Sequence, residues 1–297
     1  MAASNSHLIG QLIGNWLEEH VSSPIILACI NSSSIPSQWF LDSEGPRPAR
    51  SSTKVAWGDN GGNLHNLEHV IEHGGSRDNI GSPAAFIESA WRSYKKHSKA
   101  KAQEIEGAIM PVSRNTVVSI HGPFLGAIIA GRWTRPSIAQ LQSNDFIVLE
   151  FTHSEIISAF NSIDINVDFN EDTTVEELEQ ILEDLSGIGS DEMSSSGQNL
   201  LTDCSGKIDV FSRELLQSLD RTFTSVEVFG GPVLQWMQSG GEFPQVFDEG
   251  LAEDTSLRRW DLRVLFSDER IALSRGLTLE EINLTLNEVS NRYPAPV

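Results

Sequence analysis

The sequence predicts an α/β (α+β) fold in which a mixed sheet is flanked by helices, with an N-terminal helical segment and a small C-terminal α+β module. Short apolar runs alternate with segments of helical periodicity over residues 84–163, the order expected when helices pack on a sheet. The composition, 39% hydrophobic and 21% charged over 297 residues, is sufficient for one large core or two smaller ones.

The N-terminal third predicts helices joined by a loop. Apolar residues recur at helical spacing over residues 6–20, which predicts an amphipathic helix. Residues 32–53 are rich in Ser and Pro and predict an exposed connection. In "NLHNLEHVIEH", residues 63–73, four apolar side chains share one helical face and predict a short helix. On that helix Glu68 and Glu72 lie one turn apart, which favours a solvated face over a functional site.

The middle of the chain alternates strands with helices. Short apolar runs predict the strands, and start signals before a helical period predict helices, with Ser98 and Thr152 or Ser154 as caps and Pro136 at the first turn of another helix. The predicted strands are residues 84–91, 115–122 and 145–151, and the predicted helices are residues 97–112, 136–143, 152–163 and 174–185.

A stretch rich in Ser, Gly and acidic residues predicts a flexible linker that divides the chain. Beyond it the sequence predicts a helix, a strand, a hairpin over residues 259–276 and a closing helix. The predicted organisation is an N-terminal helical segment and loop (1–54), an α/β core (55–186), the linker (187–204) and an accessory module (205–297).

Charge is distributed unevenly along the chain. The formal net charge is -20, which does not favour long-range attraction to a polyanion. Residues 164–193 carry eleven acidic residues and no Lys or Arg, whereas residues 92–103 carry five basic residues and no acid. The basic segment 92–103 is therefore compatible with phosphate binding despite the negative net charge. No apolar run reaches the roughly 20 residues of a membrane helix, and the N-terminus lacks a basic leader, so a cytoplasmic protein is expected.

The segment "DNIGSPAAFIE" followed by a Lys- and Glu-bearing helix predicts a metal site. Asp78 opens a turn and Glu88 closes a short apolar strand, so their carboxylates can meet at one edge of the sheet and share a cation. Lys101 and Glu104 are three residues apart on the following helix and project from the same side. The alternative interpretation is a turn residue, a strand-end surface carboxylate and a solvated helix pair.

The stretch "RDNIGSPAAFIESAWRSYKKHSKAKAQEIEGA" and the run "PFLGAIIAGRWTRPSIAQLQSNDFIVLEF" resemble the PD-(D/E)XK nuclease superfamily, within it a group of bacterial restriction-type endonucleases. The similarity covers roughly residues 55–175. It implies a restriction-endonuclease-like core in which Asp78 and Glu88 match the two acidic half-motifs. The lysine of the second half-motif is replaced by Ala90, so Lys101 and Glu104 of the next helix are the expected substitutes.

The resemblance implies a Mg²⁺-dependent endodeoxyribonuclease of restriction or phage-defence type, with Mn²⁺ as a substitute metal. Asp78, Glu88 and Glu104 are the expected metal ligands, and Lys101 would orient water and stabilise charge on the phosphate. Double-stranded DNA is the expected substrate, a homodimer is expected because a duplex needs two cuts, and a methyltransferase or defence-system partner fits that role. Residues expected to contact DNA phosphates are Arg92, Lys95, Lys96, His97 and Ser98.

Two other functions stay open at this point. Ala90 and the charge of -20 favour a non-catalytic, nuclease-like subunit that serves as a docking or DNA-binding component of a larger defence complex. An RNA nuclease would differ only in its substrate. The sequence does not specify a recognition site or a cut position.

Overall fold

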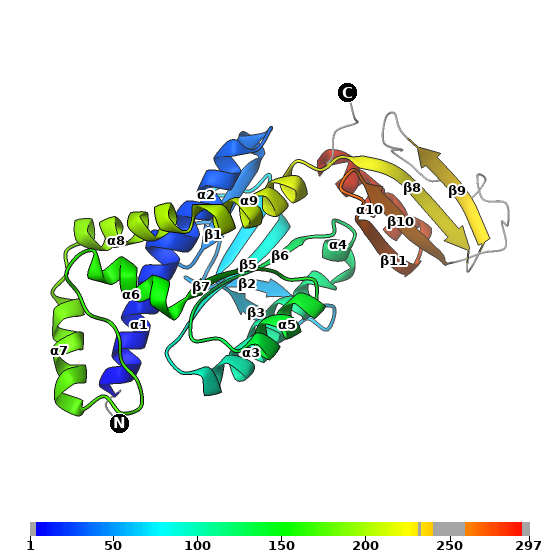
Figure 1. Cartoon of the computed structure of the whole chain (residues 1–297). Coiled ribbons are helices and arrows are strands. Elements are labelled where there is room, and N and C mark those ends of the chain that lie inside the picture. The colour runs from blue at the N-terminus through cyan, green and yellow to red at the C-terminus, as the bar shows by residue number, and fades with distance from the viewer. Residues whose placement is uncertain (1–3, 231–232, 240–258, 293–297) are drawn as a thin grey trace.

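The computed structural model describes residues 4–230, 233–239 and 259–292. Its main body is a five-stranded mixed sheet with helices on both faces (Figure 1), which confirms the predicted fold class. The strand order is β1-β4-β5-β6-β7, antiparallel from β1 to β5 and parallel from β5 to β7. The strands are β1 (Trp39–Ser43), β4 (His69–His73), β5 (Ser82–Arg92), β6 (Phe124–Gly131) and β7 (Ile147–Thr152).

The central strand β5 is buried on both faces because its side chains alternate between two apolar clusters. Ala85, Ile87 and Trp91 pack into one cluster, and Phe86 and Ala90 pack into the other. A strand that is covered on both sides has a nearly continuous apolar sequence, which is why this strand could be predicted. The alternation also places the side chain of residue 88 on the same face as those of residues 86 and 90.

Helices complete the two clusters. The cluster around Ile87 receives α1 (Asn5–Leu17), α2 (Ser23–Ser32), α6 (His153–Asn161), α7 (Val175–Ser186), α8 (Ser190–Asp203) and α9 (Ser205–Leu219). The cluster around Phe86 receives α3 (Ser98–Ser113), α5 (Arg135–Ser143) and the hairpin of β2 (Val55–Gly58) and β3 (Leu64–Leu67). A π-helical turn, η1 (Glu18–Ser22), joins α1 to α2.

Local signals account for several helix boundaries. Helix α6 begins at a capping box in which the Thr152 hydroxyl accepts the Glu155 backbone N–H and the Glu155 carboxylate accepts the Thr152 N–H. Thr174 and Glu177 repeat the arrangement at α7. These reciprocal bonds satisfy N–H groups that have no partner within the helix, and they confirm the predicted start at Thr152.

Three predicted elements were wrong. Residues 63–73 form β3 and β4 rather than a helix, because each half pairs with a distant strand, β3 with β2 and β4 with β1 and β5. Residues 115–122 contain the short helix α4 (Thr116–Ser119) and a turn rather than a strand. The stretch 32–53, predicted as a loop, supplies the edge strand β1.

The predicted flexible linker is also helical. Helix α8 buries Ser196, Gly197 and Leu200, and the Ser196 hydroxyl accepts a hydrogen bond from the Trp16 indole N–H at 2.9 Å. The serines and glycine that suggested flexibility are small residues at a close helix contact. In Figure 1, α8 and α9 run one after the other across the sheet. Since α1, α2 and α9 share the core of the sheet, the main body extends from the N-terminal helices to Leu219.

The C-terminal module is a four-stranded antiparallel sheet of order β11-β10-β8-β9, with one helix. Its elements are β8 (Phe223–Gly230), β9 (Val233–Ser239), β10 (Trp260–Phe266), β11 (Ile271–Leu277) and α10 (Leu279–Arg292). The module has its own apolar cluster and lies beside the main body in Figure 1. The Arg221 guanidinium joins the two parts by donating to the carbonyls of His121 and Gly122.

Candidate functional site

The candidate site lies where β5 extends past the first residue of β4. His69, the first residue of β4, is paired with Ile87, so the rest of β5 has no β4 partner along that edge. Glu68 stands immediately before β4, and its carboxylate accepts a hydrogen bond from the Ser89 backbone N–H. The carboxylates of Glu68 and Glu88 are therefore neighbours at the point where the two strands separate.

A lysine from α3 reaches this point from the side of the sheet that Glu88 faces. Lys101 Nζ lies 3.5 Å from Glu88 Oε1 and 2.9 Å from Glu104 Oε1. Glu88 and Lys101 are only 7% and 8% exposed. Ala90 faces the same side and belongs to the same apolar cluster as Ala102, the neighbour of Lys101. Lys101 thus approaches Glu88 from the face on which a lysine at position 90 would project.

Glu18 adds a third carboxylate from the π-helical turn η1. The turn is tied to β5 by a hydrogen bond of 2.7 Å between the hydroxyls of Ser89 and Ser22. Burial, and then the negative charges of Glu88 and Glu44, raise the pKa of Glu18 from 4.5 to about 7. Both protonation states of this carboxyl are therefore populated near neutral pH.

The other carboxyls of the cluster are also shifted toward the neutral form. Burial, followed by the charges of Glu88 and Glu18, raises the pKa of Glu68 well above its usual range. Burial raises the pKa of Glu88 despite the opposing effect of Lys101. Burial disfavours the charged form of Lys101, but the surrounding carboxylates, Glu88 first, outweigh it and raise the lysine pKa. One buried ammonium does not balance the carboxylates that converge on it.

The donor set fits a divalent cation that prefers oxygen ligands. Glu88 Oε2 is buried and accepts no N–H or hydroxyl hydrogen bond from the described residues. The neighbouring Glu68 carboxyl hydrogen-bonds to Glu88 and can donate only while it is protonated, so ionisation of both carboxyls leaves oxygens for a cation. Within the described ranges, no group of three or more His, Cys, Asp or Glu side chains is placed so that it could hold a metal ion. Mg²⁺ does not need one, because one or two carboxylates with waters and phosphate oxygens commonly suffice.

Asp78 does not join the cluster. It lies in the exposed turn between β4 and β5, where its backbone N–H donates to Ser76 Oγ. Strand β5 begins at Ser82, six residues before Glu88, and this separation corresponds to about 20 Å along a strand. Asp78 and Glu88 are thus at opposite ends of the hairpin, and the carboxylate that lies beside Glu88 is Glu68.

Glu72, which the sequence suggested on a solvated face, is instead fully buried in an ion pair. Its two carboxylate oxygens each accept from the Arg47 guanidinium at 2.8 Å, and its Oε2 also accepts the Gly81 N–H. Arg47 further contacts Asp42 at 2.7 Å. These bonds hold the hairpin of β4 and β5 and account for Glu72 without a catalytic role.

The residues expected at DNA phosphates have different environments. Ser98 is buried and its hydroxyl is bonded to the Lys95 carbonyl and to Ser137, so it does not face a ligand. Lys95, Lys96 and His97 form an exposed 3₁₀ turn, η3 (Lys95–His97). Lys96 is paired with Glu171 at 2.6 Å. Arg92 is half-buried beside Lys101 and faces Glu104.

Sequence reasoning missed Glu18 and undervalued Glu68. Glu18 follows the buried face of α1, and the π-turn that directs it toward β5 leaves no pattern in the sequence. Glu68 sits between two strands that had been predicted as one helix, which gave it a solvated environment. Correct prediction of strands β3 and β4 would have placed Glu68 at a strand junction beside Glu88.

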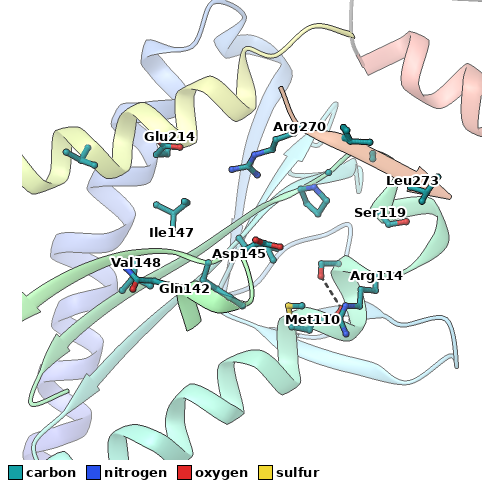
Figure 2. A pocket seen from close by; sticks show the side chains of 18 residues that line it. Met110, Arg114, Ser119, Gln142, Asp145, Ile147, Val148, Glu214, Arg270 and Leu273 are labelled. Carbon is teal, nitrogen blue, oxygen red and sulfur yellow. Dashed lines mark hydrogen bonds between the residues drawn. The ribbon is translucent and has the colours of Figure 1, made fainter. Parts of the chain in front are cut away.

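A larger cavity lies elsewhere. A cleft of about 990 Å³ separates the main body from the C-terminal module, and Figure 2 shows it lined by Arg114, Asp145, Glu214 and Arg270. None of the carboxylates described above lines it. Its walls carry charges of both signs and no buried carboxylate cluster. The candidate site is therefore the point where β4 and β5 separate, beside Glu68 and Glu88.

Comparison of the chain with protein-family models, with curated proteins and with solved structures finds no match. The resemblance to PD-(D/E)XK nucleases therefore stays a prediction. In the part of the chain that the structure describes, no helix is both long and apolar enough to span a membrane.

Proposed function

We propose that the protein is a Mg²⁺-dependent nuclease that hydrolyses phosphodiester bonds of DNA. The observation that carries the proposal is the convergence of Glu18, Glu68 and Glu88, all with raised pKa values, on the buried Lys101. Burying like charges together is costly unless a cation compensates them, and such clusters are typical of functional sites. The mixed sheet that presents them agrees with the fold that the resemblance implies.

Each residue of the candidate site would have a separate role in the reaction. Glu68 and Glu88 would hold the cation, since their carboxyls are adjacent and the hydrogen bond between them is lost when both ionise. Magnesium, when bound, supplies Lewis acidity at a phosphoryl oxygen and lowers the pKa of the attacking water. Lys101 would stabilise the negative charge that develops on the phosphate, and Glu104 orients the lysine. Glu18, with a pKa of about 7, would accept the proton of the water.

The proposal is tested by incubating the protein with supercoiled plasmid in Mg²⁺ or Mn²⁺. We expect nicked or linear product, and we expect Glu88→Gln and Glu68→Gln each to lower the rate at least about a hundredfold, since a few kcal/mol of transition-state stabilisation would be lost. The matched control is Asp78→Asn, which removes a carboxylate from the exposed turn and should leave the rate unchanged. A parallel reaction with an RNA strand tests the choice of substrate.

Metal binding has a readout that is independent of activity. Mn²⁺ should raise the melting temperature of the wild-type protein, because a ligand that binds only the folded state stabilises it. The rise should be largely lost in Glu88→Gln. Cleavage that is unaffected by either glutamine variant would disprove the assignment of these residues.

One observation favours the non-catalytic alternative. Acidic residues of the loop before α7 form salt bridges with basic residues beside the site. Glu171 pairs with Lys96, and Asp168 pairs with Arg132 at 3.0 Å. These cations are thereby less available for phosphates. An absence of cleavage with Mg²⁺ and Mn²⁺, combined with retained DNA binding, would support a docking or DNA-binding subunit instead.

A further inference from the structure

A pocket of about 500 Å³ leads from the surface to the candidate site. One wall is the N-terminal half of α1, with His7 and Gln11, and the other wall is the connection from β5 to α3, with Arg92 and His97. Lys101 and Glu104 lie in the same lining, so the pocket reaches the lysine that contacts Glu88.

Two cations and one carboxylate form the inner wall of this pocket. Glu104 places one oxygen 2.9 Å from Lys101 Nζ and the other 3.9 Å from Arg92 Nη2. The Glu104 side chain is 65% exposed, whereas Arg92 and Lys101 are 30% and 10% exposed. The two cations are therefore largely enclosed by the protein, and the carboxylate between them is the most exposed of the three groups.

Arg92 has bonding capacity that the described contacts leave unused. Its Nη1 donates to the Trp91 carbonyl at 2.8 Å, and its Nη2 has only the long contact with Glu104. A guanidinium has five N–H donors in a planar fork that matches the oxygens of a phosphate. A phosphate group can replace the Glu104 carboxylate between Arg92 and Lys101 and bond to both.

We propose that this pocket binds a phosphate of one unpaired DNA strand, with Arg92 and Lys101 as its ligands and Glu104 displaced. This inference rests on the proposed function and names its substrate as a single-stranded segment. A duplex, including a supercoiled plasmid, would have to open locally before one of its strands enters the pocket.

The dimensions of the pocket favour an unpaired strand. A duplex presents its phosphates on a rigid cylinder whose major groove alone is about 12 Å wide, whereas about 500 Å³ is the size of a small-ligand site. Glu88 and Lys101 are buried, so a phosphate must enter the pocket to reach them. Enzymes that cannot reach their target within a duplex act on a strand that is already, or becomes, unpaired.

Aromatic groups line the same pocket. Tyr94 and the exposed His97 lie on the β5–α3 connection, with ring centroids 6.3 Å apart. Stacking of bases on aromatic side chains is the usual means of holding a single strand without sequence preference. Lys95 lies beside these rings on the exposed turn, whereas Lys96 is paired with Glu171. Lys95 is therefore the cation of this turn that is available to the backbone of a strand.

The test is a binding measurement in EDTA, so that no cleavage interferes. Fluorescence anisotropy would compare a labelled single strand of about 12 nucleotides with the blunt duplex that the same strand forms with its complement. We expect the single strand to bind at least about tenfold more tightly than the duplex, and Arg92→Gln to weaken strand binding about tenfold. The matched control is Lys99→Gln, which removes the same charge from an exposed position of α3 outside the pocket lining and should change binding less than about threefold.

Replacement of Glu104 should change the affinity for the strand in the opposite direction. Because its carboxylate occupies the phosphate position, Glu104→Gln should tighten strand binding about threefold or more. Circular dichroism of each variant verifies that it is folded. Equal binding of duplex and single strand, equal losses in Arg92→Gln and Lys99→Gln, or weaker binding by Glu104→Gln would each overturn the inference.

The binding and cleavage experiments test the two proposals independently. Efficient cleavage of duplex DNA without preferential binding of a single strand would remove the inference about the pocket and leave the nuclease proposal standing. Selective strand binding that depends on Arg92, with no cleavage in Mg²⁺ or Mn²⁺, would remove the nuclease proposal and leave a strand-binding pocket.

Discussion

Replacement of Glu18 by Gln should stabilise the protein at alkaline pH and have little effect at acidic pH. In the folded protein, burial and neighbouring carboxylates raise the pKa of Glu18 from 4.5 to about 7. Between these two pH values the Glu18 carboxyl is ionised in the unfolded chain but protonated in the folded protein. The free energy of unfolding therefore falls as the pH rises. The loss is complete above the folded-state pKa. Gln mimics the protonated carboxyl and does not ionise, so it escapes this loss.

The magnitude follows from the two pKa values. An interval from 4.5 to about 7 corresponds to about 3 kcal/mol at about 1.4 kcal/mol for each pH unit. Glu18 is partly exposed, and solvent screening reduces the expected difference to roughly 2 kcal/mol. Glu18→Gln should therefore raise the free energy of unfolding by roughly 2 kcal/mol at about pH 8.5 and by less than about 0.5 kcal/mol at about pH 4.5.

Urea denaturation followed by circular dichroism at both pH values measures the effect. Glu19→Gln is the matched control, because it removes the adjacent, exposed carboxylate and should change stability by less than about 0.5 kcal/mol at either pH. A gain from Glu18→Gln of the same size at both pH values would refute the reasoning, since it would then arise from packing rather than from ionisation. Mg²⁺ added at alkaline pH should stabilise the wild-type protein, because a bound cation compensates the ionised cluster.

Two further predictions concern the framework around the site. Arg47→Met should lower the free energy of unfolding, measured by urea denaturation, by about 3–5 kcal/mol, because it leaves buried carboxylates unpaired. The control Lys54→Met breaks an exposed pair with a carboxylate and should lower it by at most about 1 kcal/mol. Similar losses in the two variants would contradict the burial of the Arg47 pair. Gly197→Ala should cost about 1–3 kcal/mol because its Cβ would lie 2.6 Å from a backbone oxygen of the π-turn. Gly206→Ala, with open space around it, should be neutral or stabilise by up to about 1 kcal/mol; a tolerated Gly197→Ala would show that α8 is not packed as described.

Sequence patterns predicted the elements that depend on local rules. The apolar run of β5, a helix cap at Thr152 or Ser154 and the hairpin of β10 and β11 all follow from neighbouring residues. The structure confirms the strand and the hairpin, and of the two candidate caps it has Thr152. The patterns failed where the partner was distant. Glu72 was assigned to a solvated helix face because the sequence around it does not show that Arg47 neutralises it inside the sheet.

The same distinction applies to the candidate site. Glu88, Lys101 and Glu104 belong to consecutive elements, so their proximity could be inferred from a strand followed by a helix, and the structure brings them together. Glu18 and Glu68 come from parts of the chain whose position relative to β5 depends on strand pairing and on a π-turn.

Local sequence patterns predicted the fold class, most helices, the strands β5, β7, β8, β10 and β11, and one side of the site, because period, capping and apolar runs act over a few residues. The tertiary structure decided which carboxylates meet. Asp78 is nearer to Glu88 along the chain than Glu68 is, 10 residues against 20. The antiparallel register of β4 and β5 nevertheless directs Glu68 toward Glu88 and Asp78 to the far end of the hairpin. Register depends on the burial of both faces of the sheet, which is a property of the whole core.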